Sequence, residues 1–217
     1  MGAPAVPLST AGSKSICGLK HCIVEIMKKV VLDDILGFGA YEKVREEFRK
    51  DIIEKKKRRR LAVGDKVSLV FENRDTVVFQ IQEMLRAERI ADLDKIREEI
   101  AVYNELIPNA GELSATLFLE IEDQGHLRAD LLKFLGIDEC VSLSVGGRLL
   151  PARFESGRSK EDKISAVQYV RFAFDEDARR AFMAGERAEL IIDHPNYQAR
   201  VFLSPEAQQS LAEDLAR

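Results

Sequence analysis

The sequence predicts an α+β fold, in which a helical N-terminal region packs on a mainly antiparallel β-sheet. Apolar residues recur at helical spacing through most of the first half of the chain, and they alternate with a period of two in the second half. Turn residues separate the predicted strands without the regular strand–helix–strand order of a parallel sheet. We expect one α+β domain over residues 27–217, with its helical part at 27–110 and its mainly strand part at 111–217.

The first 26 residues are set apart by their composition. They are rich in small residues, contain two prolines, and lack the basic start and continuous apolar core of a secretory signal. Met27 then opens the segment MKKVVLDDIL, which is typical of a natural protein start. We therefore interpret residues 1–26 as a disordered leader or a mis-assigned start.

The composition is that of a soluble globular protein. Hydrophobic residues make up 46% of the 217 residues, charged residues make up 32%, and the net charge is −4. This charge gives no global signature of a nucleic-acid-binding protein. Three cysteines leave no even disulfide framework, which favours a reducing, cytoplasmic compartment. No apolar run approaches the roughly 20 residues that a membrane helix needs.

A first long helix is predicted after Gly39. One of its faces carries four apolar or aromatic residues: Tyr41, Val44, Phe48 and Ile52. Lys55 and Arg59 continue the same face, and burying an unpaired charge is costly. The helix is therefore expected to leave the core, or to stop, near Glu54. Gly64 and Asp65 then predict a turn into a strand over Val67–Phe71.

A second long helix is predicted from Arg74 to Ile90, with Asn73 as its N-terminal cap. Its apolar stripe consists of Val77, Val78, Ile81, Met84 and Leu85. Arg74 and Glu88 fall on the same stripe, whereas Phe79 and Ile90 emerge on the opposite side. The pattern predicts a helix packed between two surfaces, with charges held at its ends. Asp92 caps a further predicted helix.

The second half predicts a sheet of six or seven strands. A long half-buried strand covers residues 113–121, and Gly146-Gly147 predicts a tight hairpin. Pro151 in the returning strand assigns that strand to a sheet edge, because proline lacks the N–H that a ladder needs. A last hairpin is expected around His194-Pro195-Asn196. Ser204-Pro205 then predicts the start of a final helix.

Four residues are candidates for a carboxylate-rich iron or manganese site: Glu83, Glu88, Glu112 and His194. Such a site predicts a metal- or cofactor-binding enzyme, although the Glu-x-x-His pair of di-iron bundles is absent. In the alternative interpretation, His194 is a turn residue, and Glu88 and Arg74 form structural ion pairs with neighbouring elements. No Walker loop, GxSxG elbow or HExxH motif occurs, so the motifs name neither an activity nor a cofactor.

A run of cations is a candidate polyanion site. It consists of Lys55, Lys56, Lys57, Arg58, Arg59 and Arg60, to which Arg74 is added. Six adjacent cations attract phosphates at low salt, which predicts a nucleic-acid- or polyanion-binding module. The alternative is a solvated helix end whose cations suit the helix dipole and are neutralised by upstream acids. No helix-turn-helix, RNA-recognition or zinc-finger pattern accompanies the run.

Three segments carry a resemblance to a known family: KKRRRLAVGDKVSLVFENRDTVVFQIQEMLRAERI, YNELIPNAGELSATL and IDHPNY. From Met27 to the C-terminus the chain resembles a bacterial uncharacterised family, number 3501 in the domain-of-unknown-function series. The resemblance implies no catalytic residues. Members of that family are often encoded beside rubrerythrin-like proteins and iron–sulfur oxidoreductases. It therefore implies a cytoplasmic accessory or interaction protein that works with a rubrerythrin-like or iron–sulfur partner.

Overall fold

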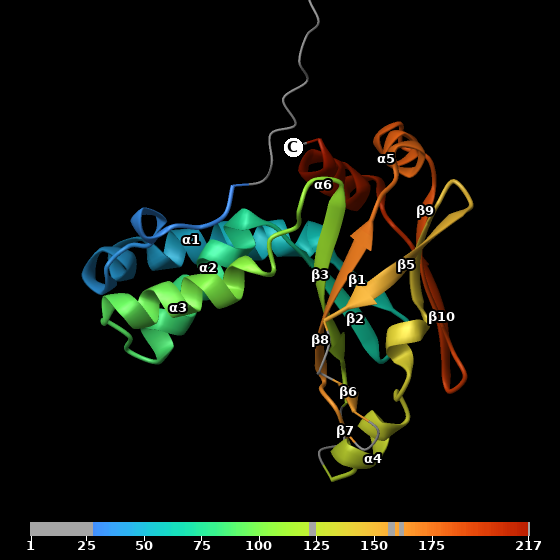
Figure 1. Cartoon of the computed structure of the whole chain (residues 1–217), viewed down its shortest axis with the longest axis horizontal. Helices are drawn as coiled ribbons and strands as arrows, with labels where there is room; N and C mark the ends of the chain where they lie inside the picture. The colour runs from blue at the N-terminus through green and yellow to red at the C-terminus, as the bar shows by residue number, and fades with distance from the viewer. Residues whose placement is uncertain (1–27, 122–124, 156–158, 161–162, 217) are drawn as a thin grey trace, which may run out of the picture.

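The computed structural model describes residues 28–121, 125–155, 159–160 and 163–216, so the predicted leader lies outside the described residues. A strongly curved β-sheet forms one part of the molecule, and an arm of three helices projects from its side (Figure 1). This arrangement confirms the predicted α+β class. The helical part and the strand part form two hydrophobic cores, one inside the arm and one inside the curved sheet.

The large sheet has eight strands in the order β1-β2-β3-β8-β5-β4-β9-β10, and all neighbours are antiparallel. Its strands are β1 (Arg60–Val63), β2 (Val67–Glu72), β3 (Glu112–Leu119), β4 (Val141–Val145), β5 (Arg148–Phe154), β8 (Val167–Ala173), β9 (Ala188–His194) and β10 (Tyr197–Phe202). The two-residue strands β6 (Ser159–Lys160) and β7 (Lys163–Ile164) form a separate ribbon. The sequence patterns missed β1, because its first residue, Arg60, belongs to the run of cations.

The two outer strands of the sheet approach each other, which gives the sheet the shape of a barrel. The hydroxyl of Tyr197 on β10 donates a hydrogen bond to the carbonyl of Val63 on β1, at 2.6 Å, and accepts one from the N–H of Lys66, at 3.0 Å. Gly64 permits this approach, because its φ of +72° favours glycine and a Cβ there would overlap the Tyr197 hydroxyl. Side chains from all eight strands contribute to the enclosed core.

The helices are α1 (Phe38–Arg59), α2 (Arg74–Ala87), α3 (Leu93–Asn104), α4 (Leu127–Leu132), α5 (Glu176–Met183) and α6 (Pro205–Leu215), with short 3-10 turns at Leu32–Asp34 and Ile137–Glu139. The predicted caps Asn73, Asp92 and Ser204 are confirmed, since each side chain accepts a backbone N–H of the first turn. α6 lies over one end of the sheet (Figure 1), where Leu211 and Leu215 join the barrel core. Among the described helices, none is long and apolar enough to cross a membrane.

The assignment of Pro151 to a sheet edge is wrong, because β5 lies between β4 and β8. β5 pairs with β4 through Pro151, which lies opposite Ser142, and its pairing with β8 begins only at Ala152. Pro151 therefore stands where the strand passes from one ladder to the other. At this position its missing N–H interrupts the pairing less than it would inside a continuous ladder.

The predicted two-sided packing of α2 is confirmed for Phe79. It is wrong for Ile90, which lies beyond the end of the helix and packs against the same core as the apolar stripe. Val77, Ile81 and Leu85 pack into the core of the arm, which includes Ile100 of α3. On the other side, the Phe79 ring contacts the Phe48 ring of α1 edge-on, with 5.5 Å between their centroids. The second face of α2 is thus covered by the chain itself.

The two charges predicted at the ends of α2 have different outcomes. Arg74 forms an ion pair at 2.6 Å with Asp34 from the preceding 3-10 turn, as expected of a structural pair with a neighbouring element. The prediction that Glu88 points into the apolar stripe is wrong. α2 ends at Ala87, so Glu88 is the C-terminal cap and its side chain is exposed.

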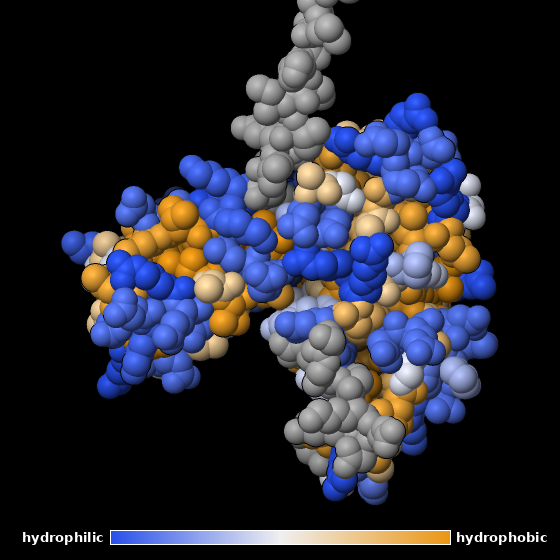
Figure 2. All heavy atoms as spheres, viewed as in Figure 1, coloured by the Kyte–Doolittle hydropathy of each residue, from blue (hydrophilic) through white to orange (hydrophobic). Residues whose placement is uncertain are grey.

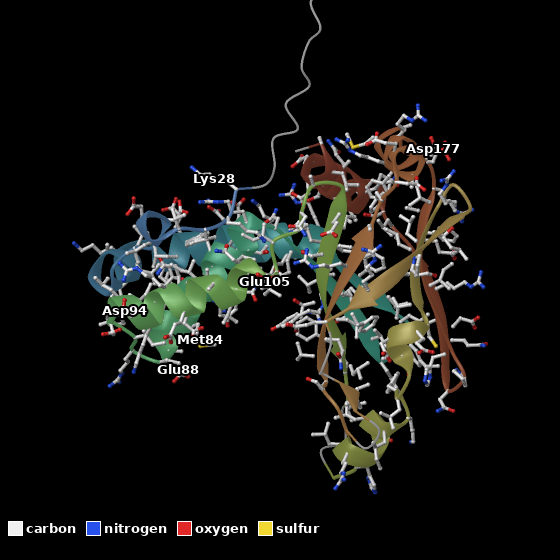
Figure 3. All side chains as sticks on the ribbon, in the orientation of Figure 1. Lys28, Met84, Glu88, Asp94, Glu105 and Asp177 are labelled. Atoms are coloured by element: carbon white, nitrogen blue, oxygen red, sulfur yellow. The ribbon has the colours of Figure 1, made fainter. Side chains whose placement is uncertain are left out.

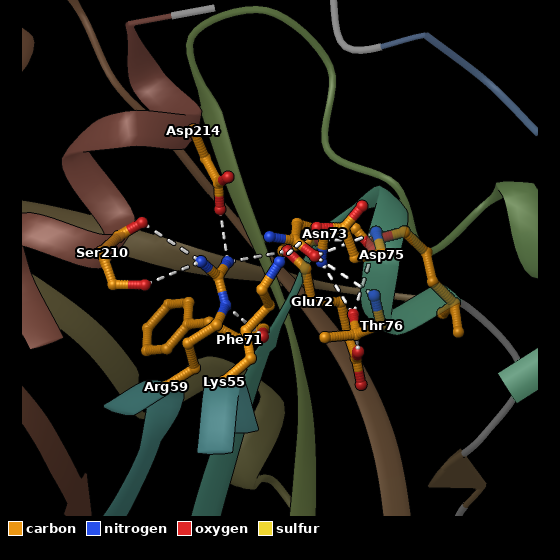
Figure 4. A network of polar contacts seen from close by, with 11 residues as sticks. Lys55, Arg59, Phe71, Glu72, Asn73, Asp75, Thr76, Ser210 and Asp214 are labelled. Atoms are coloured by element: carbon orange, nitrogen blue, oxygen red, sulfur yellow. Dashed lines mark hydrogen bonds and ion pairs between the residues drawn. The ribbon is translucent and has the colours of Figure 1, made fainter. Parts of the chain in front are cut away.

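The expectation that α1 leaves the core near Glu54 is also wrong, because the helix continues to Arg59 and buries it (Figure 4). The Arg59 guanidinium forms a buried ion pair with Asp214 of α6. It also donates to the carbonyls of Phe71, at 2.9 Å, and Glu72, at 3.2 Å. These acceptors offset the cost of removing the cation from water.

Removal of one partner of this pair should destabilise the protein strongly. Arg59→Met leaves the Asp214 carboxylate buried without its guanidinium, and we expect it to lower the free energy of unfolding by about 3–5 kcal/mol. Urea unfolding followed by circular dichroism measures the change. Arg58→Met, at the exposed neighbouring position, is the matched control and should cost less than about 0.5 kcal/mol. Equal stabilities of the two variants would contradict the role assigned to the pair.

Candidate functional site

Glu83, the first of the predicted metal ligands, is held in a clamp between α1 and α2. Its Oε1 accepts hydrogen bonds from the Tyr41 hydroxyl at 2.8 Å and from Arg45 Nε at 2.7 Å, and its Oε2 accepts one from Arg45 Nη2 at 2.8 Å. The hydrogen bonds from Arg45 lower the pKa of Glu83, whereas burial and the Glu83 carboxylate raise the pKa of Tyr41. This geometry keeps Glu83 ionised and fixes the two helices against each other.

Glu112 and Glu88 occupy separate environments. Glu112 begins β3, where its Oε2 accepts hydrogen bonds at 2.9 Å from Arg171 of β8 and from the Asn109 side chain. Glu88 is exposed beyond the end of α2, in the part of the arm that projects away from the sheet (Figure 3). The first carboxylate therefore ties a loop to the sheet, and the second faces solvent.

His194 is the last residue of β9, directly before the predicted hairpin turn, and its imidazole contacts backbone groups. The imidazole is buried, its Nε2 lies 2.8 Å from the Leu135 carbonyl, and its Nδ1 accepts the N–H of Asn196 at 3.2 Å. These contacts require the tautomer with its proton on Nε2. Phe134 stacks on the ring, with 6.4 Å between the centroids.

The structure does not bring the four predicted ligands together. Glu83 and Glu88 lie on the arm, whereas Glu112 and His194 belong to strands that are not neighbours in the sheet. Within the part of the chain that the structure describes, no group of three His, Cys, Asp or Glu side chains is placed to hold a metal ion. The four predicted ligands share a metal-binding chemistry, but the fold does not place them at one site.

The run of cations is divided among several partners. Arg59 is buried, Lys55 pairs with Asp75, Lys57 pairs with Glu54 at 2.5 Å, and Arg60 pairs with Glu120 at 2.7 Å. Among the described residues, only Lys56 and Arg58 of this run have no ion pair, and of these two only Arg58 is exposed. Most cations of the run therefore have an acidic partner, and polyanion binding through this run stays a prediction.

An apolar hollow lies in the helical arm, and we call it the tip groove. It has a volume of about 340 Å³, its lining includes Ile35, Leu85 and Ile96, and three exposed side chains line it as well: Leu36, Phe38 and Leu93. The buried Gln82 side chain forms part of one wall. Its Oε1 accepts a hydrogen bond from the N–H of Leu36 at 2.7 Å, and its Nε2 donates one to the carbonyl of Leu36 at 3.2 Å. Figure 2 shows apolar surface on this arm.

The charged residues that line this groove and the hollow next to it are arginines. Arg86 lines the tip groove, and a second hollow that shares Phe38, Arg86 and Ile90 with it is also lined by Arg89. Arg89 has a φ of +54°, the only positive φ of a non-glycine residue in the described chain. The turn that ends α2 requires this conformation, because the N–H of Ile90 bonds to the carbonyl of Leu85. Arginine is thus retained where glycine would be unstrained.

A second pocket, which we call the corner pocket, lies where the arm meets the outer face of the sheet. It has a volume of about 200 Å³, and its lining includes Glu72, Glu105, Ser114, Arg153, Tyr169 and Arg171. Figure 3 places Glu105 at the inner angle between α3 and the sheet, and Figure 2 shows the molecule hollowed between the arm and the sheet.

The sequence patterns missed both hollows for a physical reason. The alternation of Val67, Leu69 and Phe71 assigns Glu72 to the outer face of the sheet, where a carboxylate is normally solvated. The arm covers this part of the outer face, so that every residue of β2 is buried and Glu72 is only 3% exposed. The sequence signal available for the tip groove is Phe38, an aromatic residue that stands between two glycines.

The fold and these hollows define a class of protein: an antiparallel barrel-like sheet with a three-helix arm. The family described as "Protein of unknown function (DUF3501)" matches residues 29–215. The chain therefore belongs to this family. A crystal structure of a novel protein of unknown function from Burkholderia pseudomallei K96243 is similar, with 33% identity and a TM-score of 0.82. The match covers 87% of this chain and 100% of that one. No curated protein matches the chain.

Loss of the Glu83 clamp should produce a pH-dependent loss of stability. Because the folded-state pKa of Glu83 is lowered, its contribution is complete at neutral pH and is lost as the pH falls below the ordinary value of 4.5. Glu83→Gln should lower the free energy of unfolding by about 2 kcal/mol at neutral pH. The difference from wild type should shrink in urea titrations at acid pH. Glu46→Gln, which removes an exposed partner of Arg45, is the control.

Relief of the strained backbone at position 89 should stabilise the protein. Arg89→Gly removes the steric cost of a positive φ, and we expect the free energy of unfolding to rise by about 1 kcal/mol. Chemical denaturation measures this change, and Arg89→Ala separates loss of the side chain from relief of the strain. Arg97→Gly, inside α3, should have the opposite sign. A loss of stability in Arg89→Gly would show that the arginine side chain itself stabilises the fold.

Proposed function

We propose that the protein is a cytoplasmic accessory protein that docks a rubrerythrin-like or iron–sulfur partner through the tip groove. The observation that carries the proposal is the exposure of Leu36, Phe38 and Leu93, which are 43%, 61% and 55% exposed around an apolar hollow. Clustered exposed apolar side chains beside a concave surface are typical of protein interaction sites. The second face of α2 is covered by α1, so the proposed contact surface for a partner is the tip groove and not that face.

The charges beside the groove define the chemistry of the partner. Arg86 is held by Glu42 at 2.5 Å, whereas Arg89 has no ion-pair partner among the described residues. No acidic residue lines either hollow. A partner segment with apolar side chains and flanking carboxylates would complement this surface, because unlike charges at the rim guide association and set orientation. The resemblance to a family encoded beside rubrerythrin-like and iron–sulfur proteins supports the choice of partner.

The alternative of a metal-binding enzyme receives less support from the geometry. Each of the three candidate ligands already forms a hydrogen bond with another element of the chain: Glu83, Glu112 and His194. Elemental analysis of protein from cells grown in iron-rich medium tests this alternative, and stoichiometric iron or manganese would favour it over docking alone.

Loss of the aromatic side chain at the rim should weaken docking without affecting the fold. Phe38→Ser removes an exposed apolar group, and we expect the Kd for the rubrerythrin-like or iron–sulfur protein encoded beside this gene to rise about tenfold. Isothermal titration calorimetry with both redox states of the partner measures the effect. Leu149→Ser, at a 60% exposed position on β5, is the matched control and should leave the Kd unchanged.

Two results would contradict the proposal. One is the absence of heat or co-purification at micromolar concentrations in both redox states. The other is equal weakening by Phe38→Ser and Leu149→Ser, which would place the contact outside the tip groove. In addition, Arg89→Ala should weaken binding, because it removes a charge at the rim. The affinity of this variant should also fall less with added salt than the affinity of wild type does.

A further inference from the structure

The corner pocket contains two arginines that face each other across a strand pair. Arg153 of β5 and Arg171 of β8 are register partners, so their side chains lie on the same face of the sheet, and both line the pocket. Like charges that lie directly opposite each other on neighbouring strands destabilise a sheet. An anion between the two guanidiniums would remove this repulsion.

Both guanidiniums have N–H groups that donate no hydrogen bond to another described residue. Arg171 donates to Glu112 at 2.9 Å and to the carbonyl of Glu105, which fixes its position. Two of its five N–H groups are used in this way. Arg153 has no hydrogen bond or ion pair to any other residue that the structure describes. A carboxylate placed between them would find a fixed donor group on one side and an adaptable one on the other.

Glu72 provides the opposite end of the pocket. This carboxylate is buried, and all its donors are neutral: Thr116 at 2.8 Å to Oε1, and Thr76 at 2.5 Å and Gln80 at 2.9 Å to Oε2. A carboxylate offers about four acceptor positions, so Oε1 retains capacity for one more donor. No cation of the described chain occupies that position. A hydroxyl or amino group of a ligand would satisfy it.

The remaining charges and the size narrow the ligand class. Three carboxylates, Glu72, Glu105 and Glu155, line the pocket together with the two guanidiniums. Carboxylates beside the two guanidiniums disfavour a phosphate dianion and favour a monocarboxylate that also carries a hydrogen-bond donor. The volume of about 200 Å³ is below the range of about 300–1,000 Å³ that drug-sized ligands occupy, and it suits a small metabolite.

We propose that the corner pocket binds a small 2-hydroxy or 2-amino carboxylic acid. Its carboxylate lies between Arg153 and Arg171, and its hydroxyl or amino group faces Glu72. Ser114 and Tyr169 complete the lining, and Phe154 and Val170 supply apolar wall. The pocket shares no lining residue with the tip groove, so this inference does not depend on the docking proposal.

Binding is tested with glycolate, lactate, glycine and serine as probes, each at about 10 mM, by thermal shift and then by calorimetry. We expect at least one of them to raise the melting temperature. Propionate, which lacks the donor, and inorganic phosphate should not. Absence of a shift with all four probes, or equal binding of propionate or phosphate, would overturn the proposal.

Variants locate the binding within the pocket. Arg153→Gln should raise the Kd of the best probe about tenfold. The melting temperature of the free protein should not fall, because the Arg153 side chain is exposed and its repulsion of Arg171 is removed. Arg200→Gln, at an exposed position on β10, is the matched control and should bind like wild type. Glu72→Gln should change the preference between hydroxy and amino acids. Unchanged binding in Arg153→Gln would exclude the corner pocket as the site.

Discussion

The buried contact between Arg59 and Asp214 connects the two parts of the molecule. Arg59 ends α1, the acceptors of its guanidinium include the carbonyls at the end of β2, and Asp214 belongs to α6 at the other end of the chain. One side chain thus ties the end of α1 to the end of β2 and to α6, which lies over the end of the sheet. Burial of a cation is costly without several acceptors, so this arrangement is satisfied only when all three elements are in place.

The same junction creates the corner pocket. Because α1 turns directly into β1 and β2, the arm lies against the outer face of β2 and β3, and it buries polar residues that would otherwise be solvated: Glu72, Ser114 and Thr116. A buried polar cluster satisfied by neutral donors is rigid, since each member fixes its neighbours. The arm therefore has two consequences, a polar pocket at its base and an apolar groove in its body.

The candidate site residues illustrate how far residue type alone can be carried. Glu83 and Glu112 were reasonable ligands by chemistry, but an arginine from another element engages each of them. His194 is held by a carbonyl 59 residues away. Arg153 and Arg171, by contrast, have no distinctive sequence context, and only the strand register places them opposite each other.

The sequence by itself determined the α+β class, the caps at Asn73, Asp92 and Ser204, the hairpin at Gly146-Gly147 and the packing of Phe79 on the second face of α2. These features follow from local spacing and turn chemistry, which act over a few residues. Tertiary structure alone decided that Arg59 is buried, that β5 is an inner strand, that Glu88 is exposed and that Glu72 faces a pocket. Each of these depends on a partner distant in the chain, as with Arg59 and Asp214, 155 residues apart. Periodicity carries no information about which distant group will meet a side chain.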